Sequence, residues 1–267
     1  MLDSERRDVS KGQYWDGIAD SWTPDRDRLW RAHSDALNVA LCRRWLSDRR
    51  SQRLLKTDLF DEAAGRGLWP YLVTVAEHVE AIDVSHAVAK RARAQHRLTA
   101  ATADVRQLPF RDATFDTIVS NSTLDHFEDP LAIVDGLREL SRVLQRNGRL
   151  LLTLDNGANP AVAVRNALPQ RWLSRIGLIP YYMGHTLRPK AATDLLTELG
   201  FTVMHRTAIM HSPRAVTVPF SRLWQRIASD RDGNERYLGA MERFEIAERW
   251  PTRFFTGHFV AFLAQKP

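Results

Sequence analysis

From Leu54 onward, short apolar runs alternate with segments whose apolar residues recur three or four positions apart. The short runs have the length of buried strands, and the recurring pattern is typical of amphipathic helices. The predicted strands are 59–61, 79–83, 98–103, 116–120, 150–154, 201–207 and 254–263. Strands separated by helices pair in parallel through right-handed crossovers. The pattern therefore predicts an α/β fold built on a parallel, doubly wound sheet.

Local signals mark where several helices begin. Pro70 suits the first turn of a helix over 70–78, and Ser85 is a plausible N-cap. Asp129 and Pro130 fit the N-cap and first position of a long helix. The predicted apolar face of that helix consists of Leu131, Val134, Leu137, Leu140 and Leu144.

The remaining segments lack the alternation and are rich in helical patterns. The stretch after residue 155 contains many Leu, Ile, Trp and Arg residues, which indicates an inserted helical cap. The chain is therefore divided into an N-terminal helical lid (1–50), a core (51–155), a cap in two parts (156–187 and 215–250) and two segments that complete the sheet (188–214 and 251–267).

The composition is that of an ordinary globular protein. The 267 residues are 44% hydrophobic and 26% charged, enough for one full core. No apolar run approaches the roughly 18–20 residues of a membrane span. The N-terminal segment lacks the apolar core of a signal peptide, and Cys42 is the single cysteine. A cytoplasmic location is therefore expected.

The charge balance raises a second possibility. A net charge of +6 and a pI of 9.8 invite an RNA-binding interpretation. The arginines, however, are scattered singly among acidic residues rather than interleaved with aromatic ones along a track. Nucleic acid is therefore a minor alternative as partner.

Polar residues stand at four successive predicted strand ends: Asp61, Asp83, Asp104 and Asn121. In parallel sheets, ligands bind beyond the carboxyl ends of the strands, near the switch point of the topology. The first of these residues opens a small-residue turn, DEAAGRG (61–67). Such a turn before a helix brings backbone amides close to a ligand, and alone it fits a dinucleotide, a phosphate or nothing.

These segments resemble a known family. DEAAGRG resembles the acid-x-Gly-x-Gly-x-Gly motif of class I S-adenosylmethionine-dependent methyltransferases, with Ala63 in place of the first glycine. Later family motifs are matched in order by VEAIDVS (79–85), ADVRQLPF (103–110), FDTIVSNSTLDHF (115–127) and RVLQRNGRLLLTL (142–154). The resemblance implies a Rossmann-like sheet whose last strand is antiparallel. It also implies an enzyme with S-adenosylmethionine as cofactor.

The resemblance also implies which residues contact that cofactor. They are Asp61, Ala63, Gly65, Gly67, Asp83, Val84, Asp104, Val105, Asn121 and Leu124. Asp83 would accept both ribose hydroxyls, Asp104 the adenine amino group, and the Val105 amide would donate to the ring. Asp58 has no such assignment and is expected to be structural.

The residues that handle the acceptor are less constrained. His126 is the candidate general base, because the near-neutral pKa of histidine suits proton abstraction. Cap candidates for substrate contact are Tyr181, Tyr182, His185 and His211, and candidates for a lid are Tyr14, Trp15 and Trp22. The nine histidines are dispersed without paired spacing, so no metal site is predicted.

The sequence therefore favours a methyltransferase that acts on a small, partly hydrophobic molecule enclosed by the apolar cap. Three alternatives stay open: an RNA methyltransferase, a non-catalytic protein that binds the cofactor, and a nicotinamide-dependent oxidoreductase. The last is the weakest, because Pro70 stands where the full GxGxxG motif would need its final glycine.

Overall fold

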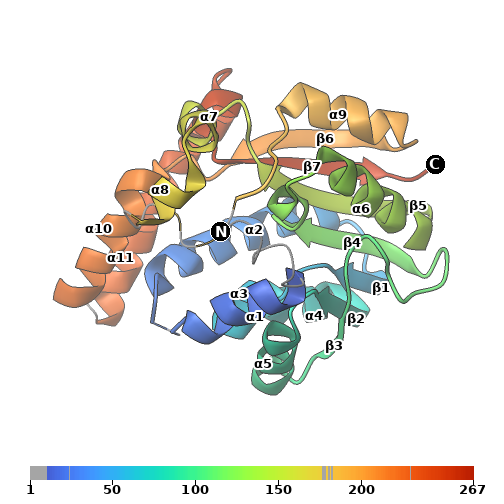
Figure 1. The fold of residues 1–267 in the computed structure, drawn as a ribbon, viewed down its shortest axis with the longest axis horizontal. Coiled ribbons are helices and arrows are strands. Elements are labelled where there is room, and N and C mark those ends of the chain that lie inside the picture. Colours follow the sequence, from blue (N-terminus) through green and yellow to red (C-terminus); the bar gives the residue numbers. More distant parts are fainter. Residues whose placement is uncertain (1–10, 24, 176–178, 180, 182, 229) are drawn as a thin grey trace, which may run out of the picture.

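A computed structural model describes residues 11–23, 25–175, 179, 181, 183–228 and 230–267. Its strands are β1 (Ser51–Lys56), β2 (Ala76–Asp83), β3 (Thr99–Thr102), β4 (Phe115–Asn121), β5 (Leu144–Asp155), β6 (Thr202–Ile209) and β7 (Phe259–Gln265). They form one sheet in the order β3-β2-β1-β4-β5-β7-β6, in which only β7 runs antiparallel to its neighbours (Figure 1). The predicted fold class is confirmed.

Helices cover both faces of this sheet. Leu54 and Leu55 are adjacent in β1 and therefore point to opposite faces. Leu55 packs with α6 (Pro130–Val143) and α9 (Pro189–Glu198), whereas Leu54 packs with α2 (Arg28–Leu46) and α4 (Trp69–Val75). Helix α5 (His86–His96) packs against β2. The alternation of buried residues in the strands thus builds a helix–sheet–helix sandwich.

The predicted first strand over 59–61 is wrong. The strand is Ser51–Lys56, which pairs with β2 and β4, and the predicted position is occupied by α3 (Phe60–Ala64). Lys56 is the last residue of β1, and its side chain is buried. Its ammonium group is 3.0 Å from Glu62 Oε2, which is buried as well. A buried lysine is costly unless it is paired. Hydrophobic periodicity gives no sign that Lys56 is paired with Glu62 and buried. The predicted strand was therefore placed after Lys56 and not before it.

Other element ends differ more modestly. Helix α4 ends at Val75, and 76–78 belong to β2. Helix α12 (Arg253–Thr256) occupies the start of the predicted last strand, which begins at Phe259. On α6, Leu131 is exposed, and the buried positions are Ala132, Ile133, Gly136, Leu137, Leu140 and Val143. The apolar face was therefore predicted correctly only towards the end of the helix.

Two predicted helix caps are confirmed. The Ser85 side chain accepts a hydrogen bond from the Val88 amide at the start of α5. The Asp129 side chain accepts one from the Leu131 amide at the start of α6. Both caps satisfy backbone donors that have no partner inside their helix.

A further group of helices lies beyond the carboxyl ends of the parallel strands, in the segments predicted to form a cap (Figure 1). It consists of α7 (Pro160–Ala167), α8 (Gln170–Arg175), α10 (Arg214–Ile227), α11 (Arg231–Glu242) and the 3-10 helix η3 (Arg243–Arg249). Helix α1 (Lys11–Ser21) and α2 extend along the same side of the molecule. The ion pair of Asp27 with Arg222, 2.6 Å between Oδ1 and Nε, joins the N-terminal segment to the cap. None of the helices in the described ranges is long and apolar enough to cross a membrane.

Candidate functional site

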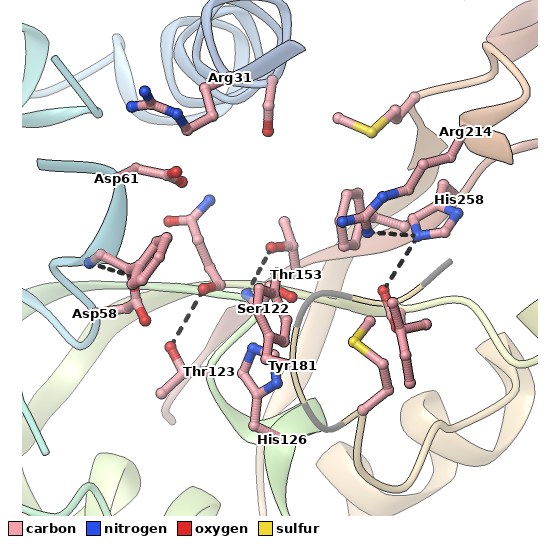
Figure 2. Close-up of a pocket in the computed structure, with 18 of the residues that line it drawn as sticks. Arg31, Asp58, Asp61, Ser122, Thr123, His126, Thr153, Tyr181, Arg214 and His258 are labelled. Atoms are coloured by element: carbon pink, nitrogen blue, oxygen red, sulfur yellow. Dashed lines mark hydrogen bonds and ion pairs between the residues drawn. The ribbon is translucent and has the colours of Figure 1, made fainter. Parts of the chain in front are cut away.

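A cavity of about 710 Å³ lies at the carboxyl ends of the strands. The sheet supplies Asp83 from β2, Asn121 from β4 and Asp155 from β5, while the lid and the cap supply the opposite wall. Figure 2 shows Asp58 and Asp61 on one side of the cavity, across from Arg214 and His258. Its volume is in the range of small-molecule sites.

Carboxyl groups gather at one end of the cavity, on the side of Asp58 and Asp61. They belong to Asp35, Asp58, Asp61, Glu62 and Asp83, and their cationic neighbours are Lys56 and Arg31. Burial, together with the nearby negative charges, raises the pKa of Asp58 to about 7 and that of Asp83 to about 6. The same causes raise the pKa of Asp35 to about 8. This end of the cavity is therefore suited to a cation, which would stabilise the ionised carboxylates.

Asp83 is held in place by two backbone donors. Its Oδ2 accepts from the Leu59 amide at 3.0 Å and its Oδ1 from the Ser85 amide at 2.8 Å. Each oxygen of a carboxylate has a second lone pair, so both can accept from a further donor. The carboxylate lines the cavity and is poised to accept from a diol.

The small-residue turn packs against side chains of the protein. Ala63, Gly65 and Gly67 do not line this cavity. Gly67 has a φ of +55°, and a Cβ there would collide with the Glu62 carboxyl group. A Cβ on Gly65 would lie 2.7 Å from Arg31 Nη1. The glycines therefore make room for side chains of the protein's own core.

Asp104 and Val105 line the next part of the cavity, after β3. Arg106 binds the Asp104 carboxylate with Nε 3.0 Å from Oδ1 and Nη2 2.6 Å from Oδ2. The Arg106 guanidinium also lies 5.0 Å from the centre of the Phe127 ring. Asp104 is thus fixed by a residue that the sequence analysis did not single out.

Asn121 presents an unsatisfied acceptor at the end of β4. Its Nδ2 donates to Asn38 Oδ1 at 2.9 Å, which fixes the orientation of the amide. The Asn121 Oδ1 atom is buried and has no hydrogen-bond partner among the described residues. Since buried polar atoms are nearly always paired, this oxygen indicates a donor on a bound molecule. Leu124, by contrast, is fully buried in the core away from the cavity.

Aromatic rings close the middle of the cavity. The Trp15 ring centre lies 4.9 Å from that of His126 and 5.3 Å from that of Tyr181. Trp22 lies 5.1 Å from Phe60, which in turn faces Tyr181. The His126 Nδ1 atom is buried without a partner in the described part of the chain. Aromatic faces attract cations, so this group complements the carboxylates beside it.

The far end of the cavity is dominated by arginines. Arg165 Nη2 is 2.6 Å from Asp155 Oδ2, and Arg214 Nη1 is 3.3 Å from His258 Nε2. Burial and the two arginines lower the pKa of His258 to about 3, so its imidazole is neutral. Burial alone would raise the pKa of Asp155, but the charges of Arg165 and Arg214 hold it below its ordinary value. Two guanidinium groups thus face one carboxylate.

Most of the predicted site residues come together in this cavity. Those that line it are Asp61, Asp83, Val84, Asp104, Val105, Asn121, His126, Tyr181, Trp15 and Trp22. Those placed elsewhere are Ala63, Gly65, Gly67, Leu124, His185, His211 and Tyr14. Tyr182 lies outside the described residues.

Several lining residues were missed from the sequence. They are Arg31, Asp58, Arg165, Arg214 and His258. Asp58, expected to be structural, follows the true end of β1 by two residues and would have been found had that strand been placed correctly. The others come from helices or loops and carry no local motif, so no signal in the sequence could have grouped them.

Comparison with known proteins finds similarity to methyltransferases over part of the chain. A family model described as a methyltransferase domain matches residues 61–152. Two Mycobacterium tuberculosis proteins, from strains CDC 1551 and H37Rv and described as probable S-adenosylmethionine-dependent methyltransferases, are 26% identical over 168 residues. Over these residues the chain is therefore similar to S-adenosylmethionine-dependent methyltransferases. The match spans 62% of this chain and 56% of each relative, little more than half their length.

Solved structures share the fold of this chain. NodS, an N-methyltransferase from Bradyrhizobium japonicum WM9, has a TM-score of 0.52 and 16% identity over 100% of this chain and 97% of its own. Geranyl diphosphate C-methyltransferase from Streptomyces coelicolor A3(2) has a TM-score of 0.56 and 13% identity, over 86% of this chain and 77% of its own. The [4+2]-cyclase SpnF has a TM-score of 0.55 and 19% identity, over 90% of this chain and 80% of its own. The cyclase illustrates that this fold does not fix the reaction.

The cavity fits the cofactor of this family. S-adenosylmethionine carries a sulfonium and an ammonium group, a ribose diol and an adenine. The acidic end and the aromatic rings suit the two cations, and the unpaired Asn121 Oδ1 suits an ammonium donor. Asp83 retains lone pairs for the diol. The donor and acceptor groups of the site thus match those of the cofactor.

Proposed function

We propose that the protein transfers a methyl group from S-adenosylmethionine to a small, partly hydrophobic molecule. The observation that carries this proposal is a single cavity with two unlike ends. One end presents Asp83 and the other carboxylates, and the other end passes into the apolar walls of the cap. A cofactor and a second molecule would therefore meet within one enclosure.

The cofactor would be held by residues from four strand ends. Asp83 would accept the ribose hydroxyls, and Asp104 with the Val105 amide would bind the adenine. Asn121 and Asp61 would accept from the ammonium group. When bound, the cofactor supplies a methyl group on a positively charged sulfur. The protein's contribution is alignment, since a displacement at carbon is accelerated mainly by holding the reacting atoms close and in line.

The acceptor would lie against apolar side chains. The residues that form this wall are Val164, Leu168, Leu173, Ile179, Met183, Val218 and Pro219. Leu173, Ile179 and Met183 also pack together as a separate buried cluster. Such a wall excludes water from the reacting atoms and favours an acceptor with an apolar body.

His126 is proposed as the group that removes a proton from the acceptor. It lines the cavity, and its buried Nδ1 is free to accept. His126→Gln is expected to lower kcat by about 10²–10⁴ while the Kd of S-adenosylmethionine is unchanged. The measurement is single-turnover methyl transfer to an acceptor found by screening.

The matched control for that variant is His185→Gln, because His185 is exposed and does not line the cavity. It is expected to keep the wild-type rate. Equal rates for the wild type and His126→Gln would remove His126 from the mechanism, leaving an acceptor that needs no base.

The affinity for S-adenosylmethionine is expected to rise with pH. Asp58 and Asp83 have pKa values raised to about 7 and about 6, so both are partly protonated near neutrality. A bound cation favours their ionised forms, and affinity should therefore increase from about pH 5 to about pH 8. The gain is about tenfold for each pKa that falls by one unit on binding. Calorimetry with the cofactor across this range measures it.

S-adenosylhomocysteine is the control for the pH series, because it lacks the sulfonium charge and should show a shallower dependence. Folding gives an independent check. These carboxyls hold their protons more tightly in the folded protein, so the cofactor-free protein should lose stability as pH rises from their ordinary pKa of 3.8 towards 7. Absence of binding at any pH, or no turnover of any acceptor in a methyl-labelled screen, would refute the proposed function.

A further inference from the structure

We propose that the acceptor carries an oxyanion, a carboxylate or a phosphate group, which binds at the start of α10 between Arg214 and Ser212. This inference rests on the proposed function and names the chemical class of its acceptor. The oxyanion would be anchored at the far end of the cavity, and the apolar body of the acceptor would extend towards the cofactor end.

The start of α10 faces the cavity and lacks a side-chain cap. Ser212, Pro213, Arg214 and Ala215 all line the cavity. Pro213 is the N-cap residue and makes no side-chain cap hydrogen bond. The first amides of a helix have no partner within the helix and carry the positive end of its dipole. In a helix of 14 residues, this end is suited to an anion.

The Ser212 hydroxyl is an independent indication of a ligand. The residue is only 2% exposed, and its Oγ has no hydrogen-bond partner among the described residues. A buried hydroxyl without a partner destabilises the folded protein, so such groups are nearly always paired. Because Ser212 lies directly before the uncapped helix start, one bound oxyanion would satisfy the hydroxyl and the helix amides together.

Arg214 supplies a positive charge that the protein leaves uncompensated at close range. In the described ranges, no carboxylate lies within 4 Å of its guanidinium group, and its hydrogen bonds are to two neutral side chains, His258 at 3.3 Å and Tyr181. The Arg214 charge favours the ionised forms of Asp155 and Asp61, and Asp155 is already engaged with Arg165 at 2.6 Å. The far end of the cavity therefore has an excess positive charge, opposite in sign to the cofactor end. A guanidinium of this kind binds carboxylate or phosphate oxygens well.

The two ends of the cavity thus select partners of opposite charge. The carboxylates attract a cationic cofactor, whereas Arg214 and the α10 start would attract an anionic acceptor. A cationic acceptor would be disfavoured at the far end by like-charge repulsion, and a neutral one would leave Ser212 Oγ unpaired. This polarity would also fix which way round the acceptor lies.

The test is a set of four probes that share one alkyl chain. Octanoate, octyl phosphate, octanol and octyltrimethylammonium are titrated by calorimetry into the full chain saturated with S-adenosylhomocysteine. The expected result is that at least one of the two anions binds at least about tenfold more tightly than octanol, the equivalent of one charge-assisted hydrogen bond. Preference for octanoate indicates a carboxylate acceptor, and preference for octyl phosphate a phosphate ester. Equal binding of the anions and octanol, or preference for the ammonium probe, would overturn the proposal.

Variants locate the binding site. Arg214→Gln and Ser212→Ala are each expected to reduce the affinity of the preferred anion about tenfold or more and to leave octanol binding unchanged. Arg226→Gln is the matched control, since it removes the same charge from an exposed position of the same helix outside the cavity. Ser212→Ala changes little volume and keeps the test valid if Arg214→Gln fails to fold. Loss in the control equal to that in both variants would contradict the proposed location.

A separate measurement of S-adenosylhomocysteine binding distinguishes a failure of this inference from a failure of the proposed function. Binding of S-adenosylhomocysteine is measured first for each variant and is expected to be unchanged, because Arg214 and Ser212 lie away from the carboxylates that would hold it (Figure 2 shows Arg214 across the cavity from Asp61). If the wild type does not bind S-adenosylhomocysteine, the proposed function fails, and the four probes are then titrated into the cofactor-free protein. If the cofactor binds and no anion is preferred, only the acceptor class fails.

Discussion

Asp83→Ala is expected to weaken S-adenosylmethionine binding by about 100-fold or more, since hydrogen bonds to a charged group contribute about 1.5–3 kcal/mol each and two ribose hydroxyls lose their acceptor. The variant also leaves the Leu59 and Ser85 amides without the oxygens that fix this wall of the cavity. Calorimetry with S-adenosylmethionine measures the loss, and thermal unfolding without cofactor verifies that the variant is folded.

Asp135→Ala is the control for this loss, because Asp135 is an exposed residue of α6 outside the cavity. It should bind the cofactor with wild-type affinity. Asp83→Asn retains one carbonyl oxygen and is expected to fall between the two. If Asp83→Ala bound the cofactor as tightly as Asp135→Ala, the assignment of the ribose to Asp83 would be wrong.

The second large effect is on folding. Lys56→Met is expected to lower the free energy of unfolding by about 3–5 kcal/mol, the usual cost of removing one member of a buried ion pair. Lys56 and Glu62 are both almost completely buried, and Asp58 and Asp61 add negative charge nearby. Removing the ammonium group would leave the buried Glu62 carboxylate without its ion-pair partner. Urea unfolding at neutral pH measures the change.

Two further variants identify the cause. Glu62→Gln added to Lys56→Met should recover part of the lost stability, because it removes a buried charge while keeping an oxygen for the Leu68 and Trp69 amides. Lys190→Met removes an ion pair with Asp194 on the surface of α9 and should change stability by less than about 0.5 kcal/mol. A double variant no more stable than Lys56→Met alone would rule out the buried pair as the source of the loss.

The same pair explains where the sequence analysis succeeded and failed. Asp83 and Asn121 were correctly placed at strand ends, because apolar strand residues lie close before each of them, Ala81-Ile82 in β2 and Ile118-Val119 in β4. The first strand was misplaced because Lys56 looks like a strand boundary until its distant partner Glu62 is known. Burial of charge is a property of the folded environment, and hydrophobic periodicity cannot report it.

The glycine turn was recognised but its purpose was not. Gly67 is required by a positive φ and by the Glu62 carboxyl group, and neither requirement involves a ligand. The far end of the cavity was unpredictable for a different reason. Arg165 and Arg214 are 49 positions apart and reach the cavity from separate helices of the cap. Only the packing of the cap brings them beside Asp155.

The position of α1 sets how long molecules stay in the cavity. Its Trp15 ring touches both His126 and Tyr181, so one helix closes over the cofactor end and the acceptor end alike. The helix is fastened through Asp16, which accepts from the Ala87 amide at 2.9 Å. Lifting of α1 would therefore uncover the rings of both His126 and Tyr181. We therefore expect the residence times of both ligands to depend on how often α1 moves away from the cavity. The turnover rate would then follow this movement more closely than the rate of methyl transfer.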